Sequence, residues 1–490
     1  MSLAQELHYI GPALALFVGA GVVLFADVLS GRRAPRWGLT LAALAVALAW
    51  TFVLAMDGDA RGEALSGAVR VDAFSIYFAF LLVGVTLAVV LCAKRWADSI
   101  EQGAEFYGLL LISAASMVLL AQGNDLITIF VALETTSIAQ FIMAGLARTD
   151  RSAEAGLKYL LTGSVAAAVL LYGFAFLFGM AGSTSLPVVA EYVASAPESG
   201  RLPLLLAFVF IIGGFGYKMA LAPFHAWVPD VYQGAPSIVG SFLSVASKAA
   251  GFAVALRVFY TGLGGGDSFM AEDWAIFVAV IAGLSMIFGN TGALLQTNAK
   301  RLLGYSSVAQ AGNVAVGFAA VAAGSTIGPS GVLFFLGTYA VTNLGAFIAV
   351  HVVAERLGTE EIADYAGLSR RSPALAAVLS LCLISLTGIP PTAGFIAKVY
   401  IFNAAVQTGH DWLVVLVAVA VVNTAISAFY YLRWVRTMWM DDPVEETRFQ
   451  PAGAVQVVLL LSGFGVLLFG VWPGPLINAA RSAAETLSIL

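Results

Sequence analysis

Long apolar stretches, separated by short polar ones, follow one another along almost the whole chain. A helix that crosses a lipid bilayer needs about 20 mostly apolar residues, and fourteen stretches of about that length occur here. They lie at 10–29, 38–56, 72–93, 106–121, 125–146, 156–179, 203–222, 237–260, 274–295, 302–323, 329–353, 372–406, 412–436 and 453–472. The pattern predicts an all-α polytopic membrane protein with about fourteen transmembrane helices.

The composition supports this fold class and excludes others. Of the 490 residues, 60% are hydrophobic and only 11% are charged, whereas a soluble domain is about 45–50% apolar and about 25% charged. This balance excludes a secreted domain, a cytosolic enzyme, a disordered chain and a nucleic-acid-binding protein. The two cysteines, Cys92 and Cys382, are too few for an iron–sulfur cluster and are expected to pack in apolar helices.

The basic residues predict the orientation of the spans. Of the 24 Lys and Arg residues, 16 fall in the odd-numbered loops and their helix ends, and 4 fall in the even-numbered loops and the termini. Cytoplasmic loops carry the excess of Lys and Arg. The odd loops are therefore expected to be cytoplasmic, with both termini on the outer side.

The other four basic residues lie inside the predicted spans: Lys218, Lys248, Arg257 and Lys398. An ionised side chain at the bilayer centre costs at least about 2.5–3.5 kcal/mol, so such residues are functional candidates. Glu134 joins them, because it lies nine residues after Asp125, and a rise of about 1.5 Å per residue places it near mid-membrane.

We interpret Glu134, Lys218, Lys248 and Lys398 as a candidate proton relay. The alternative is that Glu134 and Lys218 form a static ion pair that holds two helices together. Arg257 is expected to snorkel or to pair locally.

Two spans are predicted to break inside the membrane. Pro223 and Pro229 bracket His225 in the seventh span region, and Pro390-Pro391 interrupts the twelfth span, seven residues before Lys398. Proline disrupts a helix interior, and broken helices mark ion pathways in transporters. His225 is then either a structural histidine or a possible proton relay.

The breaks, at positions seven and twelve, predict an internal repeat of five spans. The first repeat would cover 106–260 and the second 274–440, preceded by three N-terminal helices in 1–105 and followed by a C-terminal helix at 453–472. Five is odd, so the two repeats would be inverted with respect to the membrane. Polar residues recur at helical spacing in the second half and predict either a water path or helix–helix hydrogen bonds: Ser306, Ser307, Gln310, Asn313, Thr338, Tyr339, Thr342, Asn343, Asn423, Thr424 and Ser427.

Two motifs carry a family resemblance. The segments YKMALAPFHAWVPDVYQGAP at 217–236 and LTGIPPTAGFIAK at 386–398 resemble the antiporter-like proton-conducting membrane subunits of NADH–quinone oxidoreductase (respiratory complex I). Related subunits occur in sodium/proton antiporter complexes and membrane hydrogenases. The sequence PDVY after the first break, Lys398, and fourteen spans without a long lateral C-terminal helix favour one of the three such subunits of complex I.

The resemblance implies a role for each candidate. Glu134 and Lys218 would form the coupling pair, Lys248 the central relay and Lys398 the outer-side connection. The chain would translocate protons and bind no cofactor itself, while NADH, flavin, iron–sulfur clusters and quinone would belong to partner subunits.

The expected partners are other antiporter-like subunits, the small membrane-arm subunits and the lipid bilayer, with no nucleic acid, in a bacterial inner membrane. A cation/proton antiporter subunit, a structural membrane scaffold and a solute transporter acting alone remain as alternatives.

Overall fold

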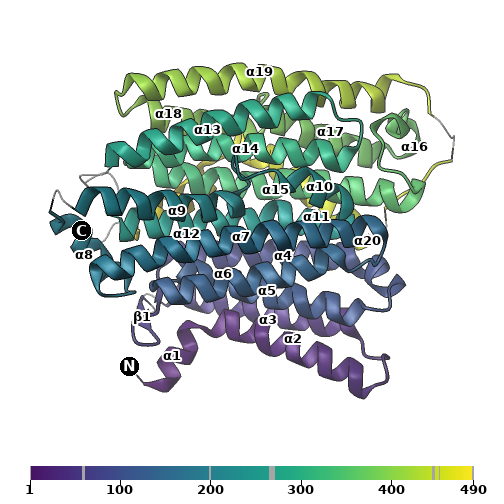
Figure 1. Ribbon diagram of the computed structural model, residues 1–490. Coiled ribbons are helices and arrows are strands. Elements are labelled where there is room, and N and C mark those ends of the chain that lie inside the picture. The colour runs from purple at the N-terminus through teal and green to yellow at the C-terminus, as the bar shows by residue number, and fades with distance from the viewer. Residues whose placement is uncertain are drawn as a thin grey trace. The chain divides into compact units, whose positions relative to one another are not determined.

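The computed structural model describes residues 2–57, 61–197, 200–263, 271–443, 447–451 and 453–487, most of which are helical (Figure 1). The chain divides into two compact units. Unit 1 comprises Met1–Met219, Ala246–Trp274 and Ala479–Leu490, and unit 2 comprises Ala220–Val245 and Ala275–Asn478.

Unit 1 is a bundle of apolar helices with one short hairpin. Its elements are α1 (Leu3–Tyr9), α2 (Gly11–Leu29), α3 (Arg36–Met56), β1 (Gly62–Ala64), β2 (Val69–Val71), α4 (Ala73–Ser99), α5 (Gly103–Gln122), α6 (Leu126–Gly145), α7 (Asp150–Ala181), α8 (Leu186–Ser195), α9 (Arg201–Met219), α12 (Lys248–Leu256) and the π-helical η3 (Arg257–Gly262). Helix α5 packs against α2, α4, α6 and α12, and α7 packs against α6 and α9. Every residue of α12 is buried.

A short β-hairpin lies between α3 and α4. Strands β1 and β2 pair antiparallel, with Gly62 opposite Val71 and Ala64 opposite Val69. The turn between them contains Leu65, Ser66 and Gly67, all with positive φ. Valines on alternate positions of β2 are buried while Arg70 between them is half-buried, and this period of two fits a strand rather than a helix.

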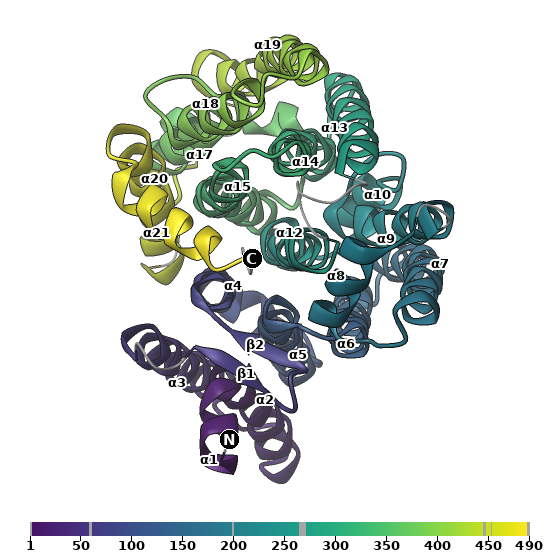
Figure 2. The same ribbon diagram turned by 90° about the vertical axis from the view of Figure 1, so that its left-hand side faces the viewer.

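The helices of unit 2 are arranged around one central helix, α15. Its elements are α10 (Trp227–Gly234), α11 (Ser237–Phe242), most of α13 (Ala271–Leu294), α14 (Ala299–Ala322), α15 (Gly328–Leu357), the 3₁₀ turn η5 (Ile362–Tyr365), α16 (Leu368–Arg371), α17 (Pro373–Thr387), α18 (Ala393–Val406), α19 (Asp411–Met440), α20 (Gly453–Val471) and the start of α21 (Gly474–Glu485). Helix α15 packs against α14, α17, α18 and α20, which lie around it when the bundle is seen end-on (Figure 2). The π-helical η2 (Leu243–Ser247) joins α11 to α12 along the chain.

The helices confirm an all-α polytopic membrane fold. Twelve described helices are long and apolar enough to cross a membrane. Two predicted spans are not among them. Helix α14 has 24 residues but carries several polar ones, and the predicted span 372–406 consists of the shorter helices α17 and α18. The predicted number of fourteen spans therefore stays a prediction.

Both predicted breaks are present. Helix α9 ends at Met219 and α10 begins at Trp227, while α17 ends at Thr387 and α18 begins at Ala393. Gly388 ends α17 with φ +90°, a left-handed conformation that glycine adopts without a steric penalty. Each unit thus contains an end of a broken helix, where backbone carbonyl groups lack helical partners.

Units 1 and 2 each contain a long helix that ends at a glycine with positive φ and is followed by the same type of return. In unit 1, α7 ends at Gly182 with φ 68°, and in unit 2, α15 ends at Gly358 with φ 69°. After each glycine the chain returns to the start of the preceding helix. Leu126 N–H donates to Thr184 O at 2.8 Å, and Ala299 N–H donates to Glu360 O at 2.8 Å.

The two helices to whose starts the chain returns, α6 and α14, also have matching N-terminal caps. Asp125 caps α6 and Asn298 caps α14, each through its side-chain oxygen. Short antiparallel bridges join Asp125 to Ser185 and Asn298 to Glu361. This correspondence supports a repeat of the helices around α6–α7 in α14–α15, while the exact repeat boundaries stay a prediction.

Both ends of the described chain lie at one end of unit 1. Phe74 N–H at the start of α4 donates to Thr486 Oγ1 at 3.2 Å, and Gln122 at the end of α5 donates to Tyr9 O at 3.3 Å. A bridge between Val69 and Gly123 joins these two helix ends. The outer-side location of the termini stays a prediction.

Candidate functional site

The first part of the site is one face of α6. Ser137 and Gln140, three residues apart, lie on this face, and Glu134, three residues before Ser137, lies at its edge. Asp125 starts the helix by accepting hydrogen bonds from the backbone of Ile127 and Thr128. Gln140 is completely buried, whereas Glu134 is half-buried.

Lys218 meets this face from the last turn of α9. Its ammonium donates to Ser137 Oγ at 3.2 Å and to Gln140 Oε1 at 3.0 Å. The residue is only 4% exposed. A buried charge is tolerated when its donors are satisfied, and here two neutral oxygens supply that satisfaction.

Glu134 and Lys218 do not form a close ion pair in the described structure. Their charges interact, but no nitrogen–oxygen contact within 4.0 Å joins them among the residues described. The static ion pair considered as an alternative is therefore not the arrangement found. Glu134 instead lies one turn before Ser137 on α6, at the edge of the face that binds Lys218.

Lys248 lies where the backbone changes from a π-helical to an α-helical pattern. It is the first residue of α12, directly after η2, and it is 2% exposed. Single π-helical turns inside α-helices are frequent at functional sites. The neighbouring Ser247 donates to Gln140 Oε1 at 2.9 Å. Lys218 and the residue before Lys248 therefore share one acceptor.

The break after α9 contains His225 in unit 2. Its ring stacks on Phe288 with ring centroids 6.0 Å apart, and its buried Nδ1 has no hydrogen-bond partner within the described residues. The nearby Ala222 N–H donates to Ser285 Oγ at 2.8 Å, which satisfies one backbone group of the break. A relay role for His225 stays a prediction.

Lys398 lies at the second break. From α18 its ammonium donates to Thr387 O at 2.9 Å, Leu386 O at 3.3 Å and Thr424 Oγ1 at 3.3 Å. The first two oxygens belong to the last turn of α17, where the helix dipole favours a positive charge. The broken helix thus supplies neutral acceptors for this 5% exposed lysine.

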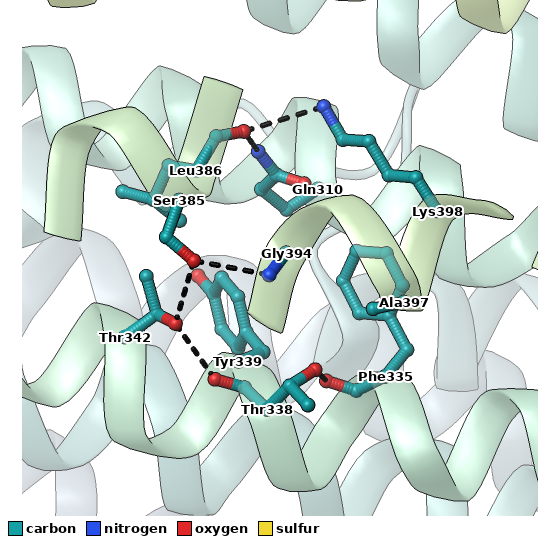
Figure 3. Close-up of a pocket in the computed structure, with 10 residues that line it drawn as sticks. All are labelled: Gln310, Phe335, Thr338, Tyr339, Thr342, Ser385, Leu386, Gly394, Ala397 and Lys398. Carbon is teal, nitrogen blue, oxygen red and sulfur yellow. Dashed lines mark hydrogen bonds between the residues drawn. The ribbon is translucent and has the colours of Figure 1, made fainter. Parts of the chain in front are cut away.

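A small cavity lies beside Lys398 (Figure 3). The centre of a water molecule can occupy about 10 Å³ of it, which is room for about one water. Gln310 donates to Leu386 O at 2.8 Å, the oxygen that also accepts from Lys398. Residues from four helices line the cavity: Gln310, Phe335, Thr338, Tyr339, Thr342, Ser385, Leu386, Gly394, Ala397 and Lys398. Four polar residues predicted for a water path are among them.

Arg257 pairs rather than snorkels. Its guanidinium, 0% exposed, donates to Asp72 at 2.5 and 3.0 Å and to Ala121 O at 2.9 Å. It also lies over the ring of Phe74, 4.8 Å from the centroid. A bidentate pair of this kind fixes the positions of the two side chains relative to each other. We therefore interpret Arg257 as a structural residue of unit 1.

Several functional partners were not predicted from the sequence. Ser137 and Gln140 accept from Lys218, and Ser247 shares the Gln140 acceptor. The signal for Ser137 and Gln140 was their three-residue spacing from Glu134 on α6. Buried Lys300 was counted as a loop residue, yet it bonds Glu360 at 2.6 Å and Ala235 O at 2.8 Å. Among the residues that the structure describes, no three His, Cys, Asp or Glu side chains form a metal-binding group.

The fold and site together define a multi-pass membrane protein whose buried lysines lie at or beside broken and π-helical segments. The chain belongs to the NADH:quinone oxidoreductase/Mrp antiporter transmembrane family, whose profile matches residues 123–424. Both motifs that carried the resemblance lie in this range, so the predicted family is confirmed.

Relatives support this assignment over most of the chain. NADH-quinone oxidoreductase subunit N of Heliobacterium modesticaldum is 41% identical over 420 residues, covering 85% of this chain and 86% of that protein. A chain of respiratory complex I from Thermus thermophilus superposes with a TM-score of 0.78 and 31% identity, covering 96% of this chain and 99% of that one. A chain of the Mrp complex from Dietzia sp. has a TM-score of 0.84 at 19% identity over 99% of this chain and 98% of its own, a likeness of fold.

Proposed function

We propose that this chain is a proton-translocating subunit in the membrane arm of an NADH–quinone oxidoreductase, respiratory complex I. The observation that carries the proposal is that three lysines, each at most 5% exposed, lie in the apolar helices of a protein whose relatives are subunit N. An uncompensated charge there would be costly. Lysines are retained at such positions when they carry protons or ions.

The partners of the lysines suit a proton carrier. Removing one partner of a buried ion pair costs about 3–5 kcal/mol, whereas a hydrogen bond from a charged group to a neutral one contributes about 1.5–3 kcal/mol. Lys218 and Lys398 are held by amide, hydroxyl and backbone oxygens. Such acceptors stabilise the protonated amine less strongly than a carboxylate would. The amine can therefore release its proton during a cycle.

In this mechanism Glu134 and Lys218 begin the relay in unit 1. When Lys218 moves toward Glu134, the carboxylate stabilises its proton, and when it returns to Ser137 and Gln140 that stabilisation falls. The proton then passes toward Lys248 in the same unit. Lys398, at the break in unit 2, would release it toward the outer side. His225 is a possible additional relay in unit 2.

Electron transfer would occur in partner subunits. NADH, flavin, iron–sulfur clusters and quinone would be bound there, and other antiporter-like and small membrane subunits would flank this chain. Free energy would reach the lysines by conformational or electrostatic coupling. The complex would lie in a bacterial inner membrane, with both termini of this chain outside.

Purification of the tagged chain from native membranes in mild detergent tests this proposal. We expect flavin- and iron–sulfur-containing subunits to co-purify together with NADH–quinone activity. Co-purification with small membrane subunits alone, and sodium-dependent proton exchange without NADH, would contradict it. The similarity of fold to the Mrp complex chain makes a cation/proton antiporter subunit the second candidate.

A further inference from the structure

Gln140 is the most highly connected polar side chain around Lys218. Its Oε1 accepts from Lys218 at 3.0 Å, from Ser247 Oγ at 2.9 Å and from Tyr159 OH at 3.2 Å. Its Nε2 donates to Ser113 Oγ at 3.2 Å. The three donors around the oxygen and the acceptor beside the nitrogen fix the orientation of this buried amide.

The oxygen of Gln140 has more donors than lone pairs. A carbonyl oxygen has two lone pairs, yet three groups donate to it, one of them the ammonium of Lys218. The three donors therefore compete. When Lys218 leaves, the oxygen is available in full to Ser247 and Tyr159, so the position of Lys218 and the hydrogen bond of Ser247 are linked.

Gln140 and Glu134 mark two positions along α6 at which the ammonium of Lys218 can bind. Glu134 lies six residues before Gln140, which is about 9 Å along the helix axis and about a third of a turn around it. Ser137 lies midway and also binds the ammonium. Lys218 is therefore held at the Gln140 end of a polar track whose other end is a carboxylate.

We propose that Gln140 is a positioning residue that holds protonated Lys218 away from Glu134 and links its position, through Ser247, to the start of α12 at Lys248. This inference rests on the proposed proton translocation and adds a residue to it. Because the amide is neutral, it orients the ammonium without neutralising its charge. A carboxylate in its place would instead trap the proton on Lys218.

The packing of α9 on α12 limits where Lys218 can move. A Cβ atom on Gly251 would lie 3.2 Å from Lys218 Cγ, so the aliphatic stem of the lysine runs directly against α12. Gly251 is one turn after Ser247 on the same helix face. The titratable groups on the helices around the ammonium are Glu134 on α6, Tyr159 on α7, Tyr217 on α9 and Lys248 on α12.

Unit 2 contains a comparable arrangement. Gln310 and Lys398 both donate to Leu386 O at the end of α17 (Figure 3). A glutamine and a lysine thus meet at one neutral oxygen in each unit. In unit 1 that oxygen belongs to the glutamine, and in unit 2 it belongs to the broken helix.

The test uses the intact complex in inverted membrane vesicles, where proton uptake and NADH oxidation are measured over a pH range of about 6 to 9. The variants are Gln140→Glu, Gln140→Met and the double variant Glu134→Gln/Gln140→Glu. Gln122→Glu is the matched control, because Gln122 is a buried glutamine on α5 that bonds Tyr9 O and not Lys218.

We expect Gln140→Glu to lower proton uptake per assembled complex several-fold at neutral pH. Its pH profile should move upward by about one unit, because an adjacent opposite charge holds a proton more tightly. The double variant should keep the upward movement, since its carboxylate at position 140 still lies beside Lys218, and should lower proton uptake further because Glu134 is gone. Gln140→Met should lower proton uptake without the upward movement, and Gln122→Glu should keep the wild-type profile.

A wild-type pH profile and wild-type proton uptake per assembled Gln140→Glu complex would overturn the inference. A pH profile that returns to that of the wild type in the double variant would overturn it as well, because the shift would then depend on the number of carboxylates and not on the one at position 140. If the complex with Gln140→Glu fails to assemble, the Gln140→Met complex provides the test. Proton uptake per Gln140→Met complex at the wild-type rate would then overturn the inference. Lys218→Met in the same vesicles separates the two proposals. Unchanged proton uptake in Lys218→Met contradicts the proposed function. Reduced uptake in Lys218→Met, together with Gln140 variants that behave like the wild type, contradicts this inference alone.

Discussion

The ammonium nitrogen of Lys218 lies 3.0 Å from the side-chain oxygen of Gln140, and within the described residues no ion pair of 4.0 Å or less joins it to Glu134. The lysine therefore has neutral partners on one face of α6, while the carboxylate of Glu134 lies about two turns before Gln140 on the same helix. An arrangement with two available partners suits a group that must bind and release a proton in turn.

The buried lysines are expected to affect activity rather than assembly. Lys248→Met or Lys398→Met should lower NADH-driven proton uptake on the order of tenfold, which corresponds to the loss of one charge-assisted interaction. The amount of assembled complex should be close to wild type, because methionine fills a similar apolar volume. Native gel electrophoresis and vesicle proton uptake measure the two quantities.

Lys94→Met is the matched control for these variants. Lys94 is 56% exposed at the side chain and pairs with Asp98 across one helical turn, an interaction that contributes about 0–1 kcal/mol. Both quantities should stay at wild-type levels. Loss of the assembled complex in Lys248→Met or Lys398→Met would favour a structural role for those lysines.

The pair between Arg257 and Asp72 should behave in the opposite way. Asp72→Asn leaves a fully buried guanidinium without its charged partner, which costs about 3–5 kcal/mol. The subunit should therefore be lost from membranes, as measured by immunoblotting. The double variant Asp72→Asn/Arg257→Leu should recover part of the loss.

An exposed pair provides the comparison. Arg32 bonds Glu101 with both side chains more than half exposed, so Glu101→Gln should change the subunit level little. Normal subunit levels in Asp72→Asn would show that the buried pair is not a structural element.

Gly388 is expected to be needed for the position of Lys398. Alanine at this site meets two obstacles: φ is +90°, and the added Cβ would lie 3.0 Å from Lys398 Cδ. The backbone strain costs about 1–2 kcal/mol, and the contact should also displace the ammonium from Thr387 O. We predict that Gly388→Ala lowers both the thermal unfolding midpoint and proton uptake.

Gly324→Ala isolates the two effects. Gly324 has φ +83° with open space around its Cβ position, so it shares the strain without the contact. Its unfolding midpoint should fall while proton uptake per complex is kept. Equal losses of uptake in the two variants would argue against a specific role for the Lys398 contact.

The orientation of the chain is testable by thiol labelling. In a variant without Cys92 and Cys382, a cysteine at Arg481 should react with a membrane-impermeant maleimide from the outer side, and one at Arg151 only from the cytoplasmic side. The distribution of Lys and Arg between loops is the basis of this expectation. Reversed labelling would contradict the predicted topology.

The sequence allowed the helical membrane fold to be predicted well, because apolar length alone identifies spans. The breaks were also predictable, since Pro223 and Pro390-Pro391 oppose a continuous helix. The hairpin at β1–β2 was not, because three-residue strands have too few positions to show alternation.

The partners of the charged residues could be predicted only in part. Lys218, Lys248 and Lys398 stand out because a charge in an apolar span is costly. Gln140 is neutral and common in membrane helices, so nothing in its own cost distinguishes it. Arg257 and Asp72 are separated by 185 residues, and only the packing of the helices shows that they meet.

The most direct test of proton translocation through Lys218 is the rate of NADH-driven proton uptake per assembled complex in inverted membrane vesicles carrying Lys218→Met, compared with wild type and Lys94→Met. We predict a fully assembled complex whose proton uptake falls on the order of tenfold, with Lys94→Met unchanged. Proton uptake at the wild-type rate in a fully assembled Lys218→Met complex would contradict it.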